Sequence, residues 1–524
     1  MQMRDQLPGR DRRAIKIPAH RGTQKPTGHK KVVVVGGGIA GLAAAVGLAE
    51  RGVHVTVVEP ENELGGRVRA WNTENDAGNI TMSRGFHAFF RQYYNLRGLL
   101  KRAGALEDLL VPLSDYPVVS VNGDRDSFAK IPRTPPWNFI KFVAQSPTFR
   151  AKDIAKVDID AALSMLDVDF PSTYSTYDGE SAAEFLDRLK FPDRARHLAL
   201  EVFARSFFAD PKEFSAGELV AMFHTYFLGS AEGLLFDVPR DDFDTSLWDP
   251  LAETLKKLGT TFLTNSVVSV SEVKSNKNNT WNVSLTDGTQ LAADAVVLAA
   301  GPSATPQIIT ASPDLSGDWA EKQISGVKLA PPFAVLRIWT DKSVNADRPP
   351  FLGTAGFGPL DNISLLERFE LGAKQWAQKH GGSVIELHAY AVPENELVNG
   401  DSAALREQLI AELERVYPET KDCKFIAEEM LVEQDCGLIG TGPWVDRPTV
   451  HTPFSGLVIA GDWVRCNLPI ALMERAATTG WMAANNLLNL WGVAGHDLWS
   501  VPIASRHKWP RGLRNLMKKR PKRG

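Results

Sequence analysis

Two glycine motifs near the start of the chain carry the strongest chemical signal in the sequence. The first is Gly36-Gly37-Gly38-Ile39-Ala40-Gly41, and the second, which follows the acidic residue Glu59, is Gly65-Gly66-Arg67. Glycine-rich turns of this kind expose backbone N–H groups at a helix N-terminus to a phosphate, and an acidic side chain further along the chain can bind a ribose. The combination predicts a dinucleotide site, which we interpret as a site for FAD.

Each glycine of the first motif has its own task. Gly36 suits a tight turn, Gly38 lets the backbone approach a pyrophosphate, and Gly41 lets the helix pack closely on the sheet. Glu59 is placed to accept hydrogen bonds from the adenosine ribose hydroxyls. An isolated motif of this type is weak evidence, so the prediction depends on the elements around it.

The surrounding elements have the required order. Val32 to Val35 has the β-branched composition of a buried strand, Leu42 to Glu50 suits a helix, and Val53 to Val58 predicts a second strand that ends at Glu59. The uncharged run from Val32 to Ala49 could also be read as a membrane span. Its five glycines and the position of the motif favour a strand, a turn and a helix.

Further pieces of a nucleotide-binding domain recur much later in the chain. They are the predicted strands Phe262–Val270, Asp294–Ala300 and Leu457–Ala460, a hairpin of Trp281–Leu285 with Asp287-Gly288, the segment Gly461-Asp462, and a helix over Ile470–Leu488. The domain is therefore discontinuous. Phe333 to Trp339 and Val384 to Val392 predict strands of a second sheet.

These patterns predict an α/β fold with a discontinuous, Rossmann-like FAD-binding domain and a second, α+β substrate-binding domain. The expected FAD-binding domain covers residues 31–95, 250–305 and 440–490, and the substrate-binding domain covers 96–249 and 306–439. A basic, disordered tail is expected over 1–30 and a basic, aromatic tail over 491–524. Aromatic residues at helical spacing between 203 and 227 are expected to be mostly core, with some lining a ligand cavity.

Composition narrows the class of protein. At 524 residues the chain exceeds what one core usually fills. The cysteines, Cys423, Cys436 and Cys466, are odd in number and widely spaced, which predicts a reducing cytoplasm. The histidines show no metal-binding spacing, so we expect no metal. No apolar segment follows the basic start, so no secretory signal is predicted.

The net charge of −3 hides basic ends on an acidic body. Nucleic acid is a poor fit as a partner because phosphates would repel that body. The last stretch mixes Trp499, Trp509, Leu513, Leu516 and Met517 with arginine and lysine. Such a mixture suits an anionic membrane surface, and a solvated tail is the alternative. We expect a cytoplasmic protein held peripherally at a membrane.

The nucleotide motifs resemble those of the flavin amine oxidase and carotenoid desaturase superfamily. The resemblance rests on Gly65-Gly66-Arg67 and on the late Gly461-Asp462 segment. It implies that Arg67 lies beside the FAD phosphates and that Asp462 bonds the ribityl or pyrophosphate region. It also implies that the following helix points its N-terminus toward the flavin ring and that Val267 contacts the adenine.

A second resemblance concerns the substrate. Residues Gly85-Phe86-His87-Ala88-Phe89-Phe90-Arg91-Gln92-Tyr93-Tyr94-Asn95 are similar to a signature of plant-type carotene desaturases. The segments beginning at Met82, Pro132, Arg205 and Tyr226 resemble the bacterial β-carotene desaturase/methylase family, over about residues 12 to 490. That family makes aromatic carotenoids of the isorenieratene type. The resemblance implies an FAD-dependent enzyme that aromatises the β-ionone end rings of β-carotene or γ-carotene.

Aromatisation of such a ring requires that a methyl group move, because one ring carbon bears two methyl groups. Hydride removal beside that carbon would leave a cation, the methyl could shift to the adjacent carbon, and proton loss with a second oxidation would complete the ring. The chain shows no second nucleotide motif for S-adenosylmethionine or NADPH. The methyl group is therefore expected to come from the substrate itself, and the electrons to pass to oxygen or a quinone.

The residues expected to serve this chemistry follow the glycine motifs. A cation needs a dry, aromatic site, and Phe86, Phe89, Phe90 and Tyr226 are the candidate lining. His87 is the candidate base, because neutral imidazole titrates near working pH, with a histidine bonded to backbone as the alternative.

Two further side chains near the motifs have open assignments. Arg84 could serve the flavin or form an ion pair. Cys466 could form a covalent flavin link, although a small buried filler is the preferred interpretation.

Three functions stay open at this point. The leading one is the aromatising carotenoid desaturase, with a desaturase of another polyene as its near variant. A flavin amine oxidase would instead place a polar substrate in an aromatic cage. A non-enzymatic alternative is a lipid-binding protein of the isoprenoid-escort type, and the intact FAD motifs speak against it.

Overall fold

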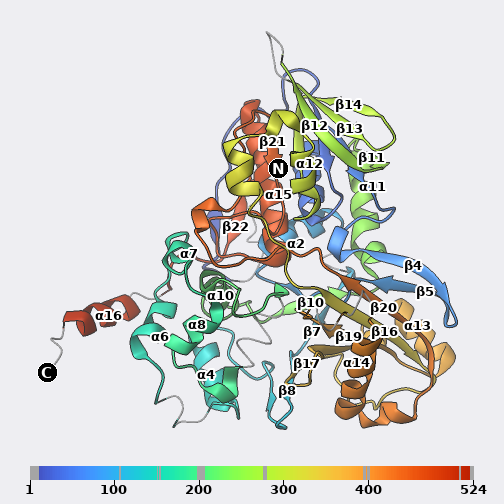
Figure 1. Ribbon diagram of the computed structural model, residues 1–524, viewed down its shortest axis with the longest axis vertical. Helices are drawn as coiled ribbons and strands as arrows, with labels where there is room; N and C mark the ends of the chain where they lie inside the picture. Colours follow the sequence, from blue (N-terminus) through green and yellow to red (C-terminus); the bar gives the residue numbers. More distant parts are fainter. Residues whose placement is uncertain are drawn as a thin grey trace.

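The computed structural model describes residues 11–104, 108–149, 152, 155–196, 207–274, 280–393, 397, 402–506 and 509–519 (Figure 1). An upper lobe holds the long helix α15 (Leu472–Leu490). A lower lobe divides into a large sheet on one side and a group of short helices on the other.

A five-stranded parallel sheet forms the centre of the upper lobe, in the order β11-β3-β2-β15-β21. Its strands are β2 (Lys31–Val35), β3 (His54–Glu59), β11 (Thr261–Thr264), β15 (Ala295–Leu298) and β21 (Leu457–Ile459). The valine run of β2 is buried because both faces of a parallel sheet are covered. The α/β fold predicted from the sequence is confirmed, and its sheet is assembled from three separate stretches of chain.

The helix that follows the glycine turn packs against a helix from near the end of the chain. In α1 (Ile39–Ala49) every residue is buried, and α15 (Leu472–Leu490) packs against it. A Cβ on Gly480 of α15 would overlap the carbonyl oxygen of Ala40, so the helices approach closely because glycine stands there. The helix α2 (Tyr94–Arg102) packs beside α15 and begins within the last two residues of the segment that resembles the carotene desaturases.

A seven-stranded sheet forms the core of one side of the lower lobe, in the order β20-β16-β19-β18-β17-β8-β9. The strands are β8 (Val118–Ser120), β9 (Arg125–Asp126), β16 (Phe333–Thr340), β17 (Phe351–Ala355), β18 (Asn362–Leu365), β19 (Val384–Ala389) and β20 (Phe425–Glu433). Helices α13 (Leu371–His380) and α14 (Ala403–Val416) accompany it. The strands predicted at 333–339 and 384–392 are confirmed as β16 and β19.

The smaller elements connect these bodies. The hairpins are β4–β5 (Ala70–Asn75, Gly78–Ser83) and β13–β14 (Thr280–Leu285, Gln290–Ala293), the latter paired with β12 (Val267–Val273). The strands β6 (Phe89–Phe90), β10 (Phe236–Pro239) and β7 (Leu110–Leu113) form a small sheet. The helices are α4 (Trp137–Gln145), α6 (Ile159–Leu166), α7 (Ser172–Thr176), α8 (Ala182–Arg188), α10 (Ala216–Phe223), α11 (Asp249–Lys257), α12 (Ala304–Thr310) and α16 (Trp509–Lys519).

The expectation of two terminal tails is wrong for most of their length. Strand β1 (Ile15–Ile17) pairs with β22 (Leu498–Ser500), which brings the two ends of the chain together. Arg506 forms a buried ion pair with Asp11 and donates to the carbonyl of Gly229. Residues 11–30 and 491–506 are therefore part of the folded body, and residues 1–10 lie outside the described residues.

One predicted strand is divided in two. The segment 262–270 was expected to run continuously, but β11 ends at Thr264 and β12 begins at Val267. Asn265 and Ser266 form the turn between them, because β11 joins the parallel sheet while β12 starts an antiparallel one. Within the part of the chain described, no helix is both long and apolar enough to cross a membrane.

Candidate functional site

The two glycine loops lie face to face at the end of β2. The N–H of Gly65 donates to the carbonyl of Gly37 at 2.9 Å, and a Cβ on Gly66 would lie 3.1 Å from the Cα of Gly38. Gly36 has φ +104°, a conformation that favours glycine. Side chains at these positions would fill the space between the loops, which opens into a large cavity.

Gly41 holds the turn against the helix that follows it. A Cβ at this position would overlap the carbonyl oxygen of Gly36 and touch Val34. Gly41 itself does not line the cavity, unlike Ile39 and Ala40 in the same turn. Its place agrees with the predicted packing task and not with direct contact to a ligand.

Glu59 lies at the end of β3 and lines the cavity. Its carboxylate accepts from the N–H of Gly37 at 2.6 Å and from the N–H of Glu61 at 3.2 Å. Burial raises the pKa of this carboxyl group. Val267 lines the same region, together with Asn265, which the sequence motifs did not indicate.

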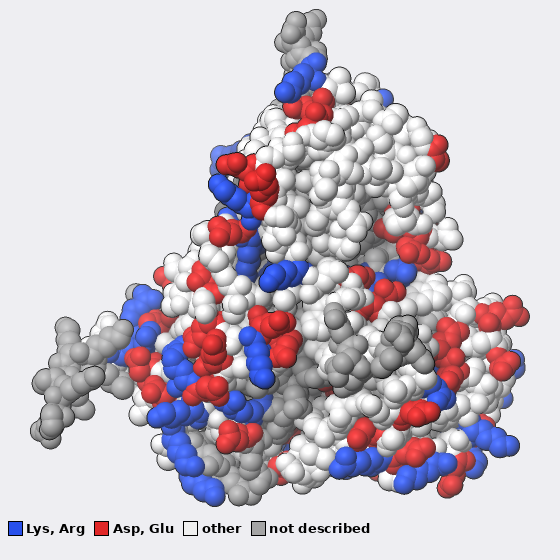
Figure 2. All heavy atoms as spheres, in the orientation of Figure 1, with Lys and Arg blue, Asp and Glu red and all other residues white. Residues whose placement is uncertain are grey.

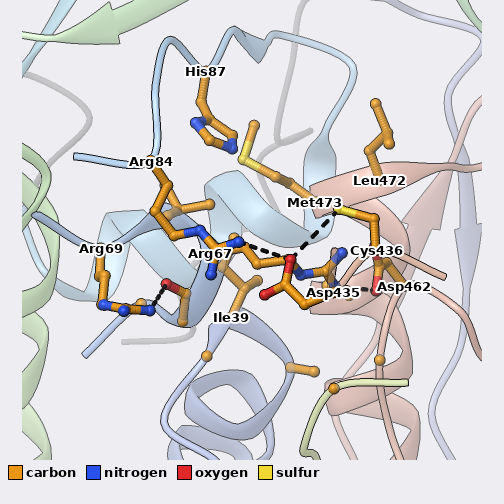
Figure 3. A pocket seen from close by; sticks show the side chains of 18 of the residues that line it. Ile39, Arg67, Arg69, Arg84, His87, Asp435, Cys436, Asp462, Leu472 and Met473 are labelled. Carbon is orange, nitrogen blue, oxygen red and sulfur yellow. Dashed lines mark hydrogen bonds and ion pairs between the residues drawn. The ribbon is translucent and has the colours of Figure 1, made fainter. Parts of the chain in front are cut away.

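Charged side chains gather where the second glycine motif meets the late Gly461-Asp462 segment (Figure 3). Arg67 and Asp462 form an ion pair, and Arg84 pairs with Asp435 at 2.7 Å. All four line the cavity, as does Gly461. Arg84, for which two roles were open, thus forms an ion pair and faces the cavity.

The first turn of α15 also reaches the cavity, through Leu472 and Met473 (Figure 3). Leu472 has φ +51°, a strained conformation for a side chain of this kind, and such strain concentrates at functional sites. The hydroxyl of Thr479 in the same helix bonds both the N–H and the carbonyl of Gly461, at 3.0 Å each. The helix N-terminus therefore faces the cavity, as the resemblance implied.

The cavity has a volume of about 590 Å³ and continues from the glycine loops into an aromatic region. That volume lies in the range of sites for small molecules and cofactors. Phe86 and Phe351 stack at 4.5 Å between ring centroids, and Phe90 meets Tyr226 edge-on at 4.8 Å. The predicted lining residues Phe86, Phe90 and Tyr226 therefore lie on the cavity wall.

The prediction that Phe89 lines the substrate site is wrong. Phe89 and Phe90 are neighbours in strand β6, and successive side chains of a strand point to opposite faces. Phe89 is fully buried and contacts Phe243 at a centroid distance of 6.5 Å. It supports the wall from behind.

His87 lines the cavity close to Met473 and Arg84 (Figure 3). Its Nδ1 lies 2.8 Å from the carbonyl of Gly85, so Nδ1 carries the proton and Nε2 keeps its lone pair. Burial lowers the pKa of His87 to about 4. The expectation of titration near working pH is therefore wrong: the ring is neutral there because the cavity walls exclude the water that would stabilise its charge.

Several wall residues were not assigned individually from the sequence, and five of them come from strands of the seven-stranded sheet, namely Phe333, Phe351, Asn362, His388 and Glu433. The additional wall residues are Tyr116, Phe128, Phe207, Phe208, Met222, Leu234, Phe236, Phe333, Phe351, Asn362, His388, Tyr390, Glu433 and Cys436. Phe207, Phe208 and Met222 belong to the aromatic stretch noted in the sequence, whereas Phe223 and Phe227 of that stretch pack together in the core. No local spacing connects the remaining residues to the glycine motifs.

The polar groups that the cavity presents fit FAD. Among the described residues, Nε of Arg84 and Nε1 of Trp463 are buried donors without a hydrogen-bond partner, and both side chains line the cavity. A buried donor left unpaired costs about 1–3 kcal/mol, so both positions favour an acceptor-rich ligand. Phosphate and flavin carbonyl oxygens would meet this need.

The position of Cys466 bears on the covalent flavin link that was considered for it. Burial raises the pKa of the Cys466 thiol to about 11, and Cys466 does not line the cavity, which favours its interpretation as a small buried filler. In the described parts of the chain, no group of three or more His, Cys, Asp or Glu side chains is placed to hold a metal ion.

Comparison with known proteins agrees with this geometry. Residues 39–488 match the family described as flavin containing amine oxidoreductase. The chain is 49% identical over 501 residues to a carotenoid phi-ring synthase of Streptomyces griseus, covering 95% of each chain. It is 26% identical over 577 residues to a carotenoid phi-ring synthase of Chlorobaculum tepidum, covering 88% of this chain and 89% of the other.

A solved structure shares the fold. An oxidoreductase from Methanosarcina mazei aligns with a TM-score of 0.61 at 17% identity, covering 86% of this chain and 98% of the other. At this identity the likeness concerns the fold alone.

Proposed function

Because the chain belongs to the family of flavin-containing amine oxidoreductases, we propose that it aromatises the β-ionone end rings of a carotenoid, with a 1,2-shift of a ring methyl group. The protein is an FAD-dependent oxidoreductase of the carotenoid-modifying, desaturase-like kind. The finer step and its substrate, β-carotene or γ-carotene, are our proposal. Its support is the relatives named carotenoid phi-ring synthases and the aromatic wall that continues from the nucleotide loops.

The aromatic wall is the observation that carries the proposal. FAD supplies the capacity to accept hydride from the ring. The chain must then protect a cation from water and stabilise it until the methyl group has moved. Faces of Phe86, Phe90 and Tyr226 can do both, because an aromatic face attracts a cation and an apolar wall excludes water.

The nucleotide loops are proposed to hold the pyrophosphate of FAD. Gly36, Gly38, Gly65 and Gly66 leave room for the pyrophosphate, with Arg67 beside it. Additional proposed contacts come from Ile39, Ala40, Glu59, Arg84, Val267, Gly461 and Asp462, while Gly41 keeps the turn in shape.

The proposal is tested with purified protein, β-carotene in mixed micelles and an added quinone, in the absence of S-adenosylmethionine. Substrate labelled with ¹³C in the two methyl groups of the quaternary ring carbon should give an aromatic ring that retains both labels. Loss of one label would contradict an internal methyl shift. A requirement for S-adenosylmethionine would contradict it as well.

Flavin amine oxidation is the second candidate, and the family name favours it. Hydrogen peroxide release across a panel of amines separates the two candidates, and activity there would sink the carotenoid proposal. Desaturation of another polyene is the near variant, which a panel of acyclic carotenes examines. The escort-protein alternative is set aside, since the chain is a flavin oxidoreductase.

His87 is proposed to accept one of the ring protons at Nε2. A cation is a strong acid, so a neutral imidazole with a low pKa is a sufficient base. Because the pKa of His87 is about 4, the ring stays neutral from pH 8 down to pH 5 and gains a proton only below that range. The titration of His87 should therefore cause no change in the rate of arene formation between pH 5 and pH 8.

The measurement is the rate of arene formation against pH, with flavin content followed at each pH. A decline of His87-dependent activity centred near 6.5, the ordinary value for histidine, would contradict the environment described here. His87→Gln is the control. A decline in rate that persists in this variant comes from the titration of another group.

Membrane attachment is proposed to involve α16, which packs against α6. Trp509, Leu513 and Leu516 of α16 are exposed, and Arg511 and Arg514 form ion pairs with acidic residues of the α6 region. Ile159 of α6 is exposed as well, and so are Trp137 and Ile140 of α4, in the same group of short helices (Figure 1). In the view of Figure 2, basic and acidic side chains are intermingled on the lower part of the molecule. We therefore assign the insertion into the membrane to the apolar residues.

Deletion of residues 509–524 should move the protein from the membrane pellet to the soluble fraction at low salt. The cut spares Arg506, whose ion pair with Asp11 belongs to the folded body. The double variant Trp509→Ser, Leu516→Ser keeps every charge and should also weaken sedimentation. Unchanged partitioning of both variants would remove α16 from the membrane proposal.

The cellular compartment and the electron acceptor both remain predictions. A reducing cytoplasm was inferred from the cysteines, and Cys423, Cys436 and Cys466 are free thiols in the structure. The electron acceptor, oxygen or a quinone, is proposed from the apolar substrate, which shares the membrane with quinones.

A further inference from the structure

We propose that Tyr390 accepts a ring proton from the substrate and passes its own phenolic proton to His388, with Glu386 holding the resulting imidazolium. This inference rests on the proposed function, and it makes Tyr390 a second proton acceptor in addition to His87. The loss of two hydrides and two protons makes a ring aromatic, so each ring must release a proton twice. Tyr390, His388 and Glu386 come from one strand, β19, and the loop directly after it.

The three side chains form a continuous hydrogen-bonded chain. The hydroxyl of Tyr390 lies 2.7 Å from Nδ1 of His388, and Nε2 of His388 lies 2.8 Å from Oε1 of Glu386. The other carboxylate oxygen of Glu386 accepts from Arg337 at 2.6 Å. Tyr390 and His388 line the cavity, whereas Glu386 and Arg337 are buried behind them.

The negative charge of Glu386 fixes the direction in which a proton moves along these three side chains. Although burial opposes ionisation, Arg337 and His388 lower the pKa of Glu386 to about 2, so it is a carboxylate. A carboxylate only accepts, so Nε2 of His388 carries the proton and Nδ1 has a lone pair. The hydroxyl of Tyr390 must then donate to Nδ1 and is ready to give up its proton there.

The position of the phenol is fixed from two further sides. The side-chain amide of Asn362 donates to the Tyr390 oxygen at 3.1 Å. The Tyr390 ring contacts Phe208 edge-on, with 5.1 Å between centroids. Phe208 has φ +58°, and backbone strain of this kind persists where the surroundings hold a residue in place for function.

The desaturase-like segment also depends on this chain. A Cβ on Gly85 would lie 2.5 Å from Cε1 of His388, so only glycine lets the segment approach the imidazole. The N–H of Phe86 also points at Nε2 of His388, at 3.2 Å. Nε2 lies closer to the carboxylate of Glu386, at 2.8 Å, and a charge-assisted hydrogen bond is the stronger one, so we assign the proton of Nε2 to Glu386 and not the acceptor role toward Phe86. The loop that carries His87 therefore packs directly on the His388 imidazole.

The proposed step balances in atoms and charge. The C–H bond beside the cationic ring carbon breaks, and its electron pair becomes the new ring double bond. The proton goes to the Tyr390 oxygen while the phenolic proton goes to Nδ1 of His388. The cation is neutralised, and the positive charge ends on an imidazolium paired with Glu386.

The test uses the full-length, FAD-loaded protein in anaerobic single turnovers with β-carotene. Flavin bleaching reports hydride removal, and chromatography with mass spectrometry reports the arene. In Tyr390→Phe we expect bleaching within about threefold of the unmodified protein but about 100-fold less arene, the range for loss of an acid–base group. Non-aromatic ring products should accumulate instead. A purely structural role would slow both readouts together.

Tyr417→Phe is the matched control, because it removes the hydroxyl of a buried tyrosine that does not line the cavity. It should keep more than about a tenth of arene formation, well above Tyr390→Phe. His388→Gln is the second variant: glutamine can still donate to Glu386 but cannot take up a proton, so it should uncouple bleaching from arene formation too.

The outcomes separate the two proposals. No bleaching and no arene with the unmodified protein would overturn the proposed function. Normal arene formation by Tyr390→Phe, or by His388→Gln with full flavin content, would overturn the relay and leave the proposed function intact.

Discussion

Gly41→Val is expected to abolish FAD retention. The Cβ of any residue at position 41 would overlap the carbonyl oxygen of Gly36, and the branched side chain would also strike Val34. The first turn of α1 would have to move away from β2, and the N–H groups that we propose to face the FAD phosphates would move with it. The measurement is the flavin-to-protein ratio after gentle purification, which should fall at least about tenfold, a binding loss of about 1.4 kcal/mol or more.

Gly98→Val in α2 is the matched control. Gly98 is also a helical glycine, but a Cβ there meets only the flexible end of Arg102, at 3.9 Å. Both variants lose glycine from a helix, and only one closes the nucleotide turn. Normal flavin content in folded Gly41→Val protein would refute the placement of the FAD site.

Gly85→Ala should remove arene formation and lower the melting temperature. The added Cβ would meet Cε1 of His388 at 2.5 Å and Nε2 at 2.9 Å, and Gly85 has φ +98°. Two costs are expected: about 1–2 kcal/mol for the left-handed backbone and about 1–3 kcal/mol for the crowding. Differential scanning calorimetry and pigment analysis measure the two effects.

Gly78→Ala separates these two costs. Gly78, the first residue of β5, has φ +97°, and nothing lies within 4 Å of its Cβ position. It should show the backbone cost alone and keep full arene formation. Equal effects of the two substitutions would mean that the approach of residue 85 to His388 has no importance.

The nucleotide half of the site was predictable because each of its parts is a contiguous stretch. A glycine turn, its strand and its helix are fixed by neighbouring residues, and Glu59 follows from strand length. Even so, the break at Asn265 was missed, since two strands of different sheets follow each other with only a short turn between them.

The substrate half could be predicted only where a local signature existed. Phe86 and Phe90 do line the cavity, but Phe89 was included because a run of aromatics does not reveal which face of a two-residue strand is inward. His388 and Tyr390 lie about 300 residues further along the chain and reach the site through sheet pairing. Long-range pairing of this kind leaves no spacing signal in one sequence.

The terminal segments were misread for a different reason. Their basic composition suggests solvated tails, and nothing local predicts that β1 pairs with β22. The ion pair of Asp11 with Arg506 joins residues from opposite ends of the chain. Composition reports average solvation and does not reveal a partner that distant in sequence.

The central claim is ring aromatisation with an internal methyl shift, and one measurement tests it most directly. The protein is produced in a bacterial host that accumulates β-carotene, and the pigments are separated by chromatography and identified by mass spectrometry and absorption. The account predicts a product that has lost four hydrogens per converted ring with no change in carbon count. Unaltered β-carotene, with FAD confirmed on the protein, would contradict it.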